Sequence, residues 1–192
     1  MEHESALILL AFAALVIAAV ACDLHSRRIP NSLVLVGMAL GLVFQTVAAT
    51  GGGLFNGTAG GGLGPTQALL GAAAGLALFL PMYALRALGA GDAKLLGMIG
   101  MWLGAGPVAW AALWTLLAGG VLALAVALGS GVLRQVLANL REMLLHSMVR
   151  AQLGSAVSVA PPSRTTGRLP YALAIACGAA IEVTRQLTRA GP

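Results

Sequence analysis

The chain consists of long apolar runs separated by short polar segments. No charged residue lies between Arg28 and Arg86, and none lies between Lys94 and Arg134. A helix that crosses a bilayer needs roughly 20 apolar residues, within a range of about 17–25. The pattern predicts an all-α, polytopic membrane protein with six transmembrane helices, the fourth of them short, over residues 5–22, 32–49, 67–85, 93–103, 108–128 and 170–184.

The fourth and fifth predicted helices share one apolar run that is too long for a single span. The segment Gly104-Ala105-Gly106-Pro107 interrupts this run, because glycine and proline end helices. Further along, residues 132–146 carry apolar side chains at helical spacing and charged side chains on the other face, which predicts an amphipathic helix on the inner membrane surface. We expect one integral membrane domain over residues 1–192.

Composition supports the membrane assignment. The chain is 59% hydrophobic and 9% charged, whereas soluble domains average about 25% charged residues. The net charge of +5 comes from basic residues scattered between apolar runs. They form no stripe of basic and aromatic residues, so we expect no nucleic-acid partner. Cys22 and Cys177 lie in separate apolar runs, a spacing that indicates neither a metal site nor a disulfide framework.

The basic residues predict the orientation in the membrane. With six spans, nine of the eleven Lys and Arg residues fall on one side, and only Arg185 and Arg189 fall on the other. The positive-inside rule makes the richer side cytoplasmic and places both termini outside. Asp23 and Asp92 then lie at the cytoplasmic face. An aromatic belt at the outer turn near Pro107 is expected from Trp102, Trp110 and Trp114.

Asp23 and Asp92 are the candidate functional residues. The chain has only six carboxylic acid side chains, and these two lie at the ends of apolar runs, where an ionisable group is costly and therefore indicates a function. Two carboxyl groups brought close together share a proton. The ionised acid can then take a proton from water while the neutral acid polarises a peptide carbonyl. Asp23 is expected at the C-terminus of a helix, where the helix dipole should raise its pKa, and Asp92 at the N-terminus of a helix, where the dipole should lower its pKa. Asp23 is therefore the expected holder of the shared proton.

Each acid also has a structural interpretation. Asp23 could pair with Arg27 or Arg28 at the interface. Asp92 could simply cap the fourth helix, a place that aspartate favours. Taken alone, neither motif distinguishes a structural role from a catalytic one.

The neighbours of the two acids have expected roles of their own. Pro30 and Asn31 are typical of a helix start. Gly89 and Gly91 precede the second acid and are expected to let the backbone turn tightly. Lys94 either supports this region or contacts a substrate; alternatively it extends its charge to the membrane surface.

The two motifs together carry a resemblance. Asp23 followed by Arg28-Ile29-Pro30-Asn31, and later Gly89-Ala90-Gly91-Asp92-Ala93-Lys94-Leu95, resembles the type IV prepilin peptidase family. Glycine-x-glycine-aspartate also marks the wider intramembrane aspartyl proteases, which include presenilin. The resemblance extends over about residues 5–128. The final span, with Leu169-Pro170-Tyr171 and Ala174-Ile175-Ala176-Cys177-Gly178, also resembles the family's ending.

The resemblance implies a function and a location. It implies that Asp23 and Asp92 are the catalytic dyad, supported by Arg28, Pro30, Asn31, Gly89, Gly91 and Lys94. It implies an aspartic endopeptidase of the bacterial inner membrane that cleaves the leader peptides of prepilins or pseudopilins at the cytoplasmic face, with membrane lipids around it and no cofactor or metal. Only residues 24–31 separate the first two spans, which resembles the compact tight-adherence (Flp) pilus type without the methyltransferase insert, so methyl transfer is not expected.

Two other functions are compatible with paired acids in a membrane protein. A proton-coupled carrier uses such acids as a relay, although carriers place them near the midplane and contain repeated halves. In a non-catalytic subunit of a pilus or secretion assembly, both aspartates would be replaceable. The position of the acids at one edge and the lack of an internal repeat favour the peptidase.

Overall fold

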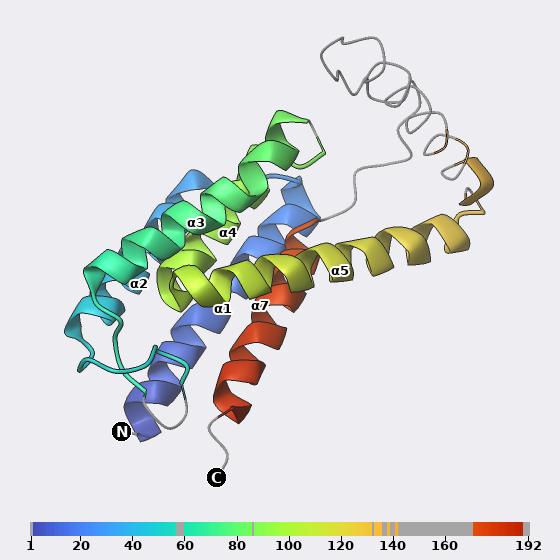
Figure 1. Cartoon of the computed structure of the whole chain (residues 1–192). Helices are drawn as coiled ribbons and strands as arrows, with labels where there is room; N and C mark the ends of the chain where they lie inside the picture. Colours follow the sequence, from blue (N-terminus) through green and yellow to red (C-terminus); the bar gives the residue numbers. More distant parts are fainter. Residues whose placement is uncertain are drawn as a thin grey trace, which may run out of the picture. The chain divides into compact units, whose positions relative to one another are not determined.

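The computed structural model describes residues 2–56, 60–85, 87–131, 133–135, 138, 141 and 171–189. Within these ranges the chain is helical, and its β-type pairings are two isolated bridges, Thr50 with Gly62 and Gly53 with Gly61. The helices are α1 (Glu2–Ser26), α2 (Asn31–Val47), α3 (Pro65–Ala84), α4 (Ala90–Leu103), α5 (Ala105–Gly129) and α7 (Tyr171–Thr188) (Figure 1). They match the six predicted apolar runs to within a few residues.

The chain divides into two compact units. The first comprises Met1–Gly119 and Pro170–Pro192, and the second comprises Gly120–Leu169. Both acids belong to the first unit, which contains α1 to α4, α7 and the first part of α5. The predicted amphipathic segment, residues 132–146, falls largely outside the described residues and stays a prediction.

Three of the described helices have the length and composition that crossing a bilayer requires. They are the part of α1 from Ala6 to Ser26, α3, and α5. The apolar helix α2 is shorter. Large apolar side chains on these helices are exposed on the surface of the protein, among them Leu10, Leu35, Leu80 and Leu117, as expected where lipid rather than water surrounds the helix.

Proline and glycine lie at several helix ends, of which Pro30 and Gly104 were singled out in the sequence and Pro65 was not. Pro30 immediately precedes α2, and Pro65 is the first residue of α3. Gly104 ends α4 with φ +84°, a left-handed conformation that glycine adopts at no steric cost. The interruption predicted over four residues is a single residue long, since α5 begins at Ala105 and Pro107 lies in its first turn, where the missing N–H is harmless.

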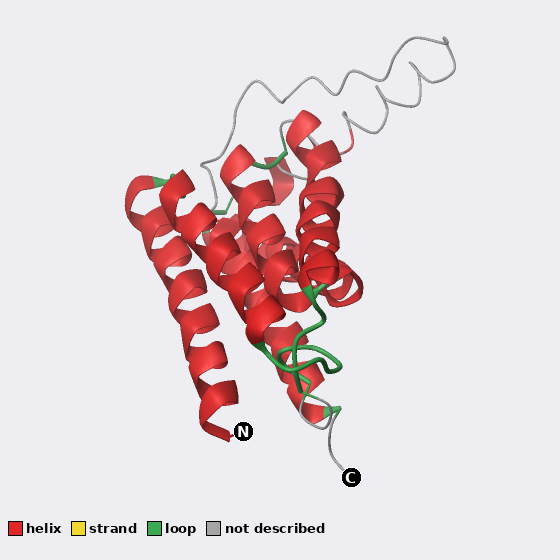
Figure 2. Cartoon of the chain, turned by 90° about the vertical axis from the view of Figure 1, so that its left-hand side faces the viewer, coloured by secondary structure: helices red, strands yellow, loops and turns green. Residues whose placement is uncertain are grey.

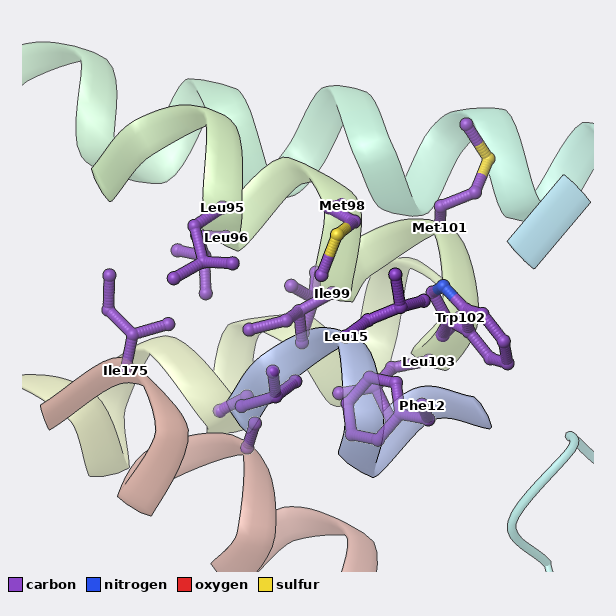
Figure 3. Close-up of a cluster of buried hydrophobic side chains, with 14 of the residues drawn as sticks. Phe12, Leu15, Leu95, Leu96, Met98, Ile99, Met101, Trp102, Leu103 and Ile175 are labelled. Carbon is purple, nitrogen blue, oxygen red and sulfur yellow. The ribbon is translucent and has the colours of Figure 1, made fainter. Parts of the chain in front are cut away.

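Helix α4 is the core of the first unit. Apart from the exposed Lys94, its residues from Ala93 to Leu103 are all buried, as expected for a helix that is apolar on every face. Figure 3 shows α4 side chains packed against Phe12 and Leu15 of α1 and against Ile175 of α7. The short fourth helix is therefore enclosed by protein, and its N-terminus is held in a fixed place.

Helices α3 and α4 approach at glycine positions. A Cβ atom added to Gly71 of α3 would collide with the backbone carbonyl of Gly100 in α4, and one added to Gly100 would collide with Gly71. Gly75 meets the backbone at Leu96 in the same way. Small residues allow two apolar helices to pack backbone to backbone, which strengthens van der Waals contact where lipid offers no hydrophobic driving force.

Trp102 does not belong to an interfacial belt, so the prediction for this residue is wrong. Its side chain is fully buried and its Nε1–H donates to the Gly37 carbonyl at 2.9 Å. The indole ring lies 5.6 Å from the Phe12 ring and 5.4 Å from the Phe44 ring, measured between centroids. Because its polar atom finds a partner inside the protein, tryptophan can serve here as a core residue.

A buried ion pair lies near the far end of α7. Glu182 is 1% exposed, and its carboxylate accepts hydrogen bonds from Arg185 at 2.8 and 3.1 Å. The Arg185 guanidinium lies 4.7 Å from the centroid of the Trp110 ring. The ion pair compensates part of the cost of burying the Glu182 carboxylate.

Gln45 connects α2 to the end of α4 and to the loop before α3. Its buried side chain donates to the Trp102 carbonyl at 2.8 Å and accepts from the Leu63 N–H at 2.7 Å. We expect Gln45→Leu to lower the free energy of unfolding by about 1–3 kcal/mol, because it leaves buried polar groups unpaired. Thermal unfolding in detergent tests this. Thr46→Val, at the exposed neighbouring position, is the control and should change the midpoint little; equal shifts in both variants would contradict the assignment.

Candidate active site

The C-terminus of α1 and the N-termini of α4 and α7 lie toward the same end of the helices (Figures 1 and 2), and the two acids belong to the first two of these helix ends. Asp23 is half-buried in the last turn of α1, and its backbone carbonyl accepts the Arg27 N–H at 2.9 Å. Its side-chain Oδ2 accepts the backbone N–H of Ala172, at the start of α7, at 3.2 Å. Asp23 is thus held by a helix that follows it much later in the chain.

Asp92 is half-buried in the first turn of α4. Its Oδ2 accepts the Gly89 N–H at 2.9 Å, and its own N–H donates to the Gly89 carbonyl at 3.1 Å. Asp92 therefore reaches back to cap its own helix, as the acid of a capping box does. The structural interpretation of this residue is correct in part, and it leaves the other carboxylate oxygen available for chemistry.

The glycines before Asp92 do not provide a tight turn. Gly89 has φ −80°, which any residue adopts, and Gly91 lies inside the helix. A Cβ atom added to Gly91 would contact the Ile29 side chain at 3.5 Å. This is an ordinary van der Waals distance, so Gly91 lies close to the loop between α1 and α2 but would leave room for a methyl group.

Burial raises the pKa of the Asp92 carboxyl, which precedes the predicted span over residues 93–103. The hydrogen bond from Gly89 lowers this pKa, and the charge of Asp23 raises it again. The direction is opposite to that expected from the helix dipole alone, because loss of solvation outweighs the favourable helix N-terminus. Asp23 and Asp92 are close enough to interact electrostatically, as a carboxyl pair that shares a proton must be.

The charge interaction predicts a measurable coupling. We expect Asp23→Asn to lower the pKa of Asp92, because the variant removes a nearby negative charge that disfavours a second one. The pKa should stay above the ordinary value of an aspartate, since the burial remains. Infrared titration of the Asp92 carboxyl band in both proteins measures the change. An unchanged or higher pKa in the variant would show that the two acids do not interact.

The supporting residues take different positions. The Lys94 Nζ donates to Asn31 Oδ1 at 3.0 Å, which ties the start of α4 to the start of α2. Pro30 precedes α2 and fixes where that helix begins. Arg28 is exposed, and its carbonyl accepts the Ser26 hydroxyl at 3.1 Å. The polar residues of the two motifs therefore meet through the pair Lys94 and Asn31 as well as through the acids.

The start of α7 belongs to the same region, although no site role was predicted for it from the sequence. Ala172 contacts Asp23 through its backbone, and Tyr171 is close enough to Asp92 to interact with it electrostatically. The signal in the sequence was indirect. The predicted topology brings the beginning of the last span to the same membrane face as both acids, but it does not identify which residues meet them.

The chemistry that this arrangement offers is proton transfer. Among the described residues, no three His, Cys, Asp or Glu side chains come together in a way that could hold a metal ion. Each carboxyl group is half-buried and accepts one backbone N–H, Asp23 from Ala172 of another helix and Asp92 from Gly89 at the start of its own helix.

Comparison with known families gives one result. A model of the type IV leader peptidase family matches residues 10–128 of the chain, a range that contains both acids and both motifs. No curated protein matches the chain, and no solved structure does.

Proposed function

The chain belongs to the type IV leader peptidase family, and on that premise we propose that it is a membrane-embedded aspartic endopeptidase with Asp23 and Asp92 as its catalytic pair. Its substrates are the leader peptides of type IV, Flp-like prepilins or pseudopilins. Membership of the family identifies a peptidase, and the three long apolar helices indicate an integral membrane protein. The aspartic mechanism and the pilin substrate go beyond family membership and form the proposal.

One observation carries the proposal. Two half-buried carboxyl groups from distant parts of the sequence interact electrostatically within one packed unit. Each is held by a backbone N–H, from Ala172 and from Gly89 respectively. Neither arrangement is needed to close the hydrophobic core, and burying two acids near each other opposes folding. A catalytic role explains why both are present.

The reaction is the hydrolysis of a peptide bond without a covalent intermediate. The ionised acid takes a proton from water, and the resulting hydroxyl attacks the scissile carbonyl carbon while the neutral acid gives its proton to the carbonyl oxygen. The tetrahedral diol then breaks its C–N bond. The amine nitrogen takes the proton from the first acid, and the second acid recovers a proton from the diol. One carboxylic acid and one amine form, and the pair again holds one proton.

The proposed placement in the membrane follows the charge distribution. Six spans put both termini outside and the acids at the cytoplasmic face of the bacterial inner membrane, where a basic leader peptide lies before export. The exposed Arg28 and Lys94 lie near the acids at that face. Methyl transfer and a cofactor are not part of the proposal, since the connection between α1 and α2 is a few residues long.

Co-expression with a candidate Flp-type prepilin tests the function. The wild-type protein should convert the precursor to the mature form on a gel, and sequencing of the new N-terminus should show a single cut after the basic leader. A proton-coupled carrier or an assembly subunit would leave every tested precursor intact. Cleavage that persists when both aspartates are replaced would instead indicate another peptidase in the cell.

A further inference from the structure

Tyr171 is the first residue of α7, the helix whose N-terminus contacts Asp23. We propose that its phenol hydroxyl is a third catalytic group, a neutral hydrogen-bond donor to the oxygen of the scissile carbonyl as negative charge develops there. This inference rests on the proposed function and goes beyond it, because the two sequence motifs assign no catalytic role to the last helix.

The backbone places Tyr171 next to Asp23. Tyr171 is bonded to Ala172, whose N–H donates to Asp23 Oδ2 at 3.2 Å, so standard bond lengths put the Tyr171 Cα atom no more than about 6 Å from that oxygen. The side chain is also close enough to Asp92 to interact with it electrostatically. Helix α7 packs against both α1 and α4, from which the two acids come. One side chain of α7 thus borders both members of the pair.

Two other helices hold the ring of Tyr171. Its centroid lies 6.3 Å from the centroid of the Phe79 ring of α3. On the side of α5, a Cβ atom added to Gly119 would lie 2.8 Å from a carbon of the ring and 2.9 Å from the hydroxyl oxygen. The glycine therefore makes room for the polar end of the phenol. A half-buried tyrosine held in this way packs its apolar ring against the protein and keeps its hydroxyl at a fixed point.

The Tyr171 hydroxyl is available to a ligand. It forms no hydrogen bond with another residue in the described part of the chain. Two other donors in the motifs are already engaged. The Ser26 hydroxyl donates to the Cys22 carbonyl at 2.8 Å. The Lys94 Nζ donates to Asn31 Oδ1 at 3.0 Å. Tyr171 therefore offers a neutral donor beside the acids that folding leaves unused.

A donor at this point acts on the transition state. Attack by water places negative charge on the carbonyl oxygen until the neutral acid has given up its proton. The phenol donates a hydrogen bond to that oxygen and keeps its own proton, so the proton balance of the two acids is unchanged. A donor that the protein fixes in advance stabilises such charge without reorganisation at the moment of reaction. Because the hydrogen bond strengthens in the transition state, its loss lowers kcat more than it raises KM.

Tyr171→Phe tests the role of the hydroxyl and keeps the ring in place. We expect kcat to fall roughly a hundredfold, the order that one such donor contributes, with KM and the unfolding temperature close to the wild-type values. Tyr83→Phe is the matched control, because Tyr83 is the other tyrosine of the chain and is 46% exposed near the end of α3. It should keep the wild-type kcat. Wild-type kcat in Tyr171→Phe, an equal loss in both variants, or a loss that accompanies a lower unfolding temperature would overturn the inference.

A leader peptide with a hydrated ketone at the scissile position provides a second measurement. Its geminal diol resembles the tetrahedral intermediate, and an intact leader resembles the ground state. In Tyr171→Phe the inhibition constant of the diol should rise by about the factor by which kcat/KM falls, and in Tyr83→Phe it should stay unchanged. Equal inhibition of the wild-type protein and Tyr171→Phe would overturn the inference alone. Failure of the wild-type protein to cleave any prepilin would instead contradict the proposed function, and the inference with it.

Discussion

We expect Asp23→Asn and Asp92→Asn each to reduce the proposed leader cleavage by roughly a thousandfold, within the range that general acid–base groups contribute. Asparagine keeps the size of the side chain but can neither accept a proton from water nor give one to the carbonyl oxygen. If the two acids act as a unit, as proposed, the double variant should be little slower than either single variant. The measurement is the rate of precursor conversion per folded, membrane-inserted protein.

Glu182→Gln is the matched control for this prediction. Glu182 is also a buried acid, but it pairs with Arg185 near the far end of α7 from Tyr171 and Ala172. Its replacement should leave cleavage within a few-fold of wild type, as expected of a change outside the site. If Glu182→Gln lost as much cleavage activity as the two aspartate variants, the loss would reflect the removal of any half-buried or buried acid and not a special role of Asp23 and Asp92.

Gly71→Ala and Gly100→Ala have the largest expected effect on folding. Each added methyl group falls on the backbone of the opposing helix, which cannot move aside as a side chain could. Overpacking of a core costs about 1–3 kcal/mol and occasionally more, and we expect the upper part of this range. The variants should unfold at a lower temperature and should give less folded protein after extraction into detergent.

Gly120→Ala, in α5, provides the comparison. A Cβ atom at Gly120 meets nothing within 4 Å, and alanine is favoured over glycine in a helix interior by about 1 kcal/mol. Its unfolding temperature should therefore equal or slightly exceed that of the wild-type protein. Unchanged stability in Gly100→Ala would show that α3 and α4 do not pack at these glycines.

The sequence predicted where the helices begin and end better than it predicted which residues surround each helix. Apolar length, together with Pro30 and Gly104 at helix ends, was enough to place the described helices to within a few residues, because these signals are local. The burial of α4 on all sides depends on which helices surround it, and the run from Ala93 to Leu103 reads equally well as a lipid-facing span. For the same reason Trp102 was assigned to the interface and lies in the core.

Within the candidate site, the two acids were predictable and their environments were not. Two isolated aspartates in small polar motifs are visible in the sequence, as are Lys94 and Asn31, although the hydrogen bond between these two was not predicted. The contact between Asp23 and Ala172 joins parts of the chain that no local pattern connects. The pKa of Asp92 was expected to fall because the helix dipole was the known influence, whereas burial, which raises it, depends on the packed structure.

The most direct measurement uses the purified protein in lipid nanodiscs with a synthetic prepilin that carries its leader. Mass spectrometry of the products should show one cut by the wild-type protein and none by Asp23→Asn or Asp92→Asn. Both variants should still insert into the membrane, and their thermal unfolding transitions should match that of the wild-type protein. Cleavage at the wild-type rate by either folded variant would contradict the assignment of these two acids as the catalytic pair.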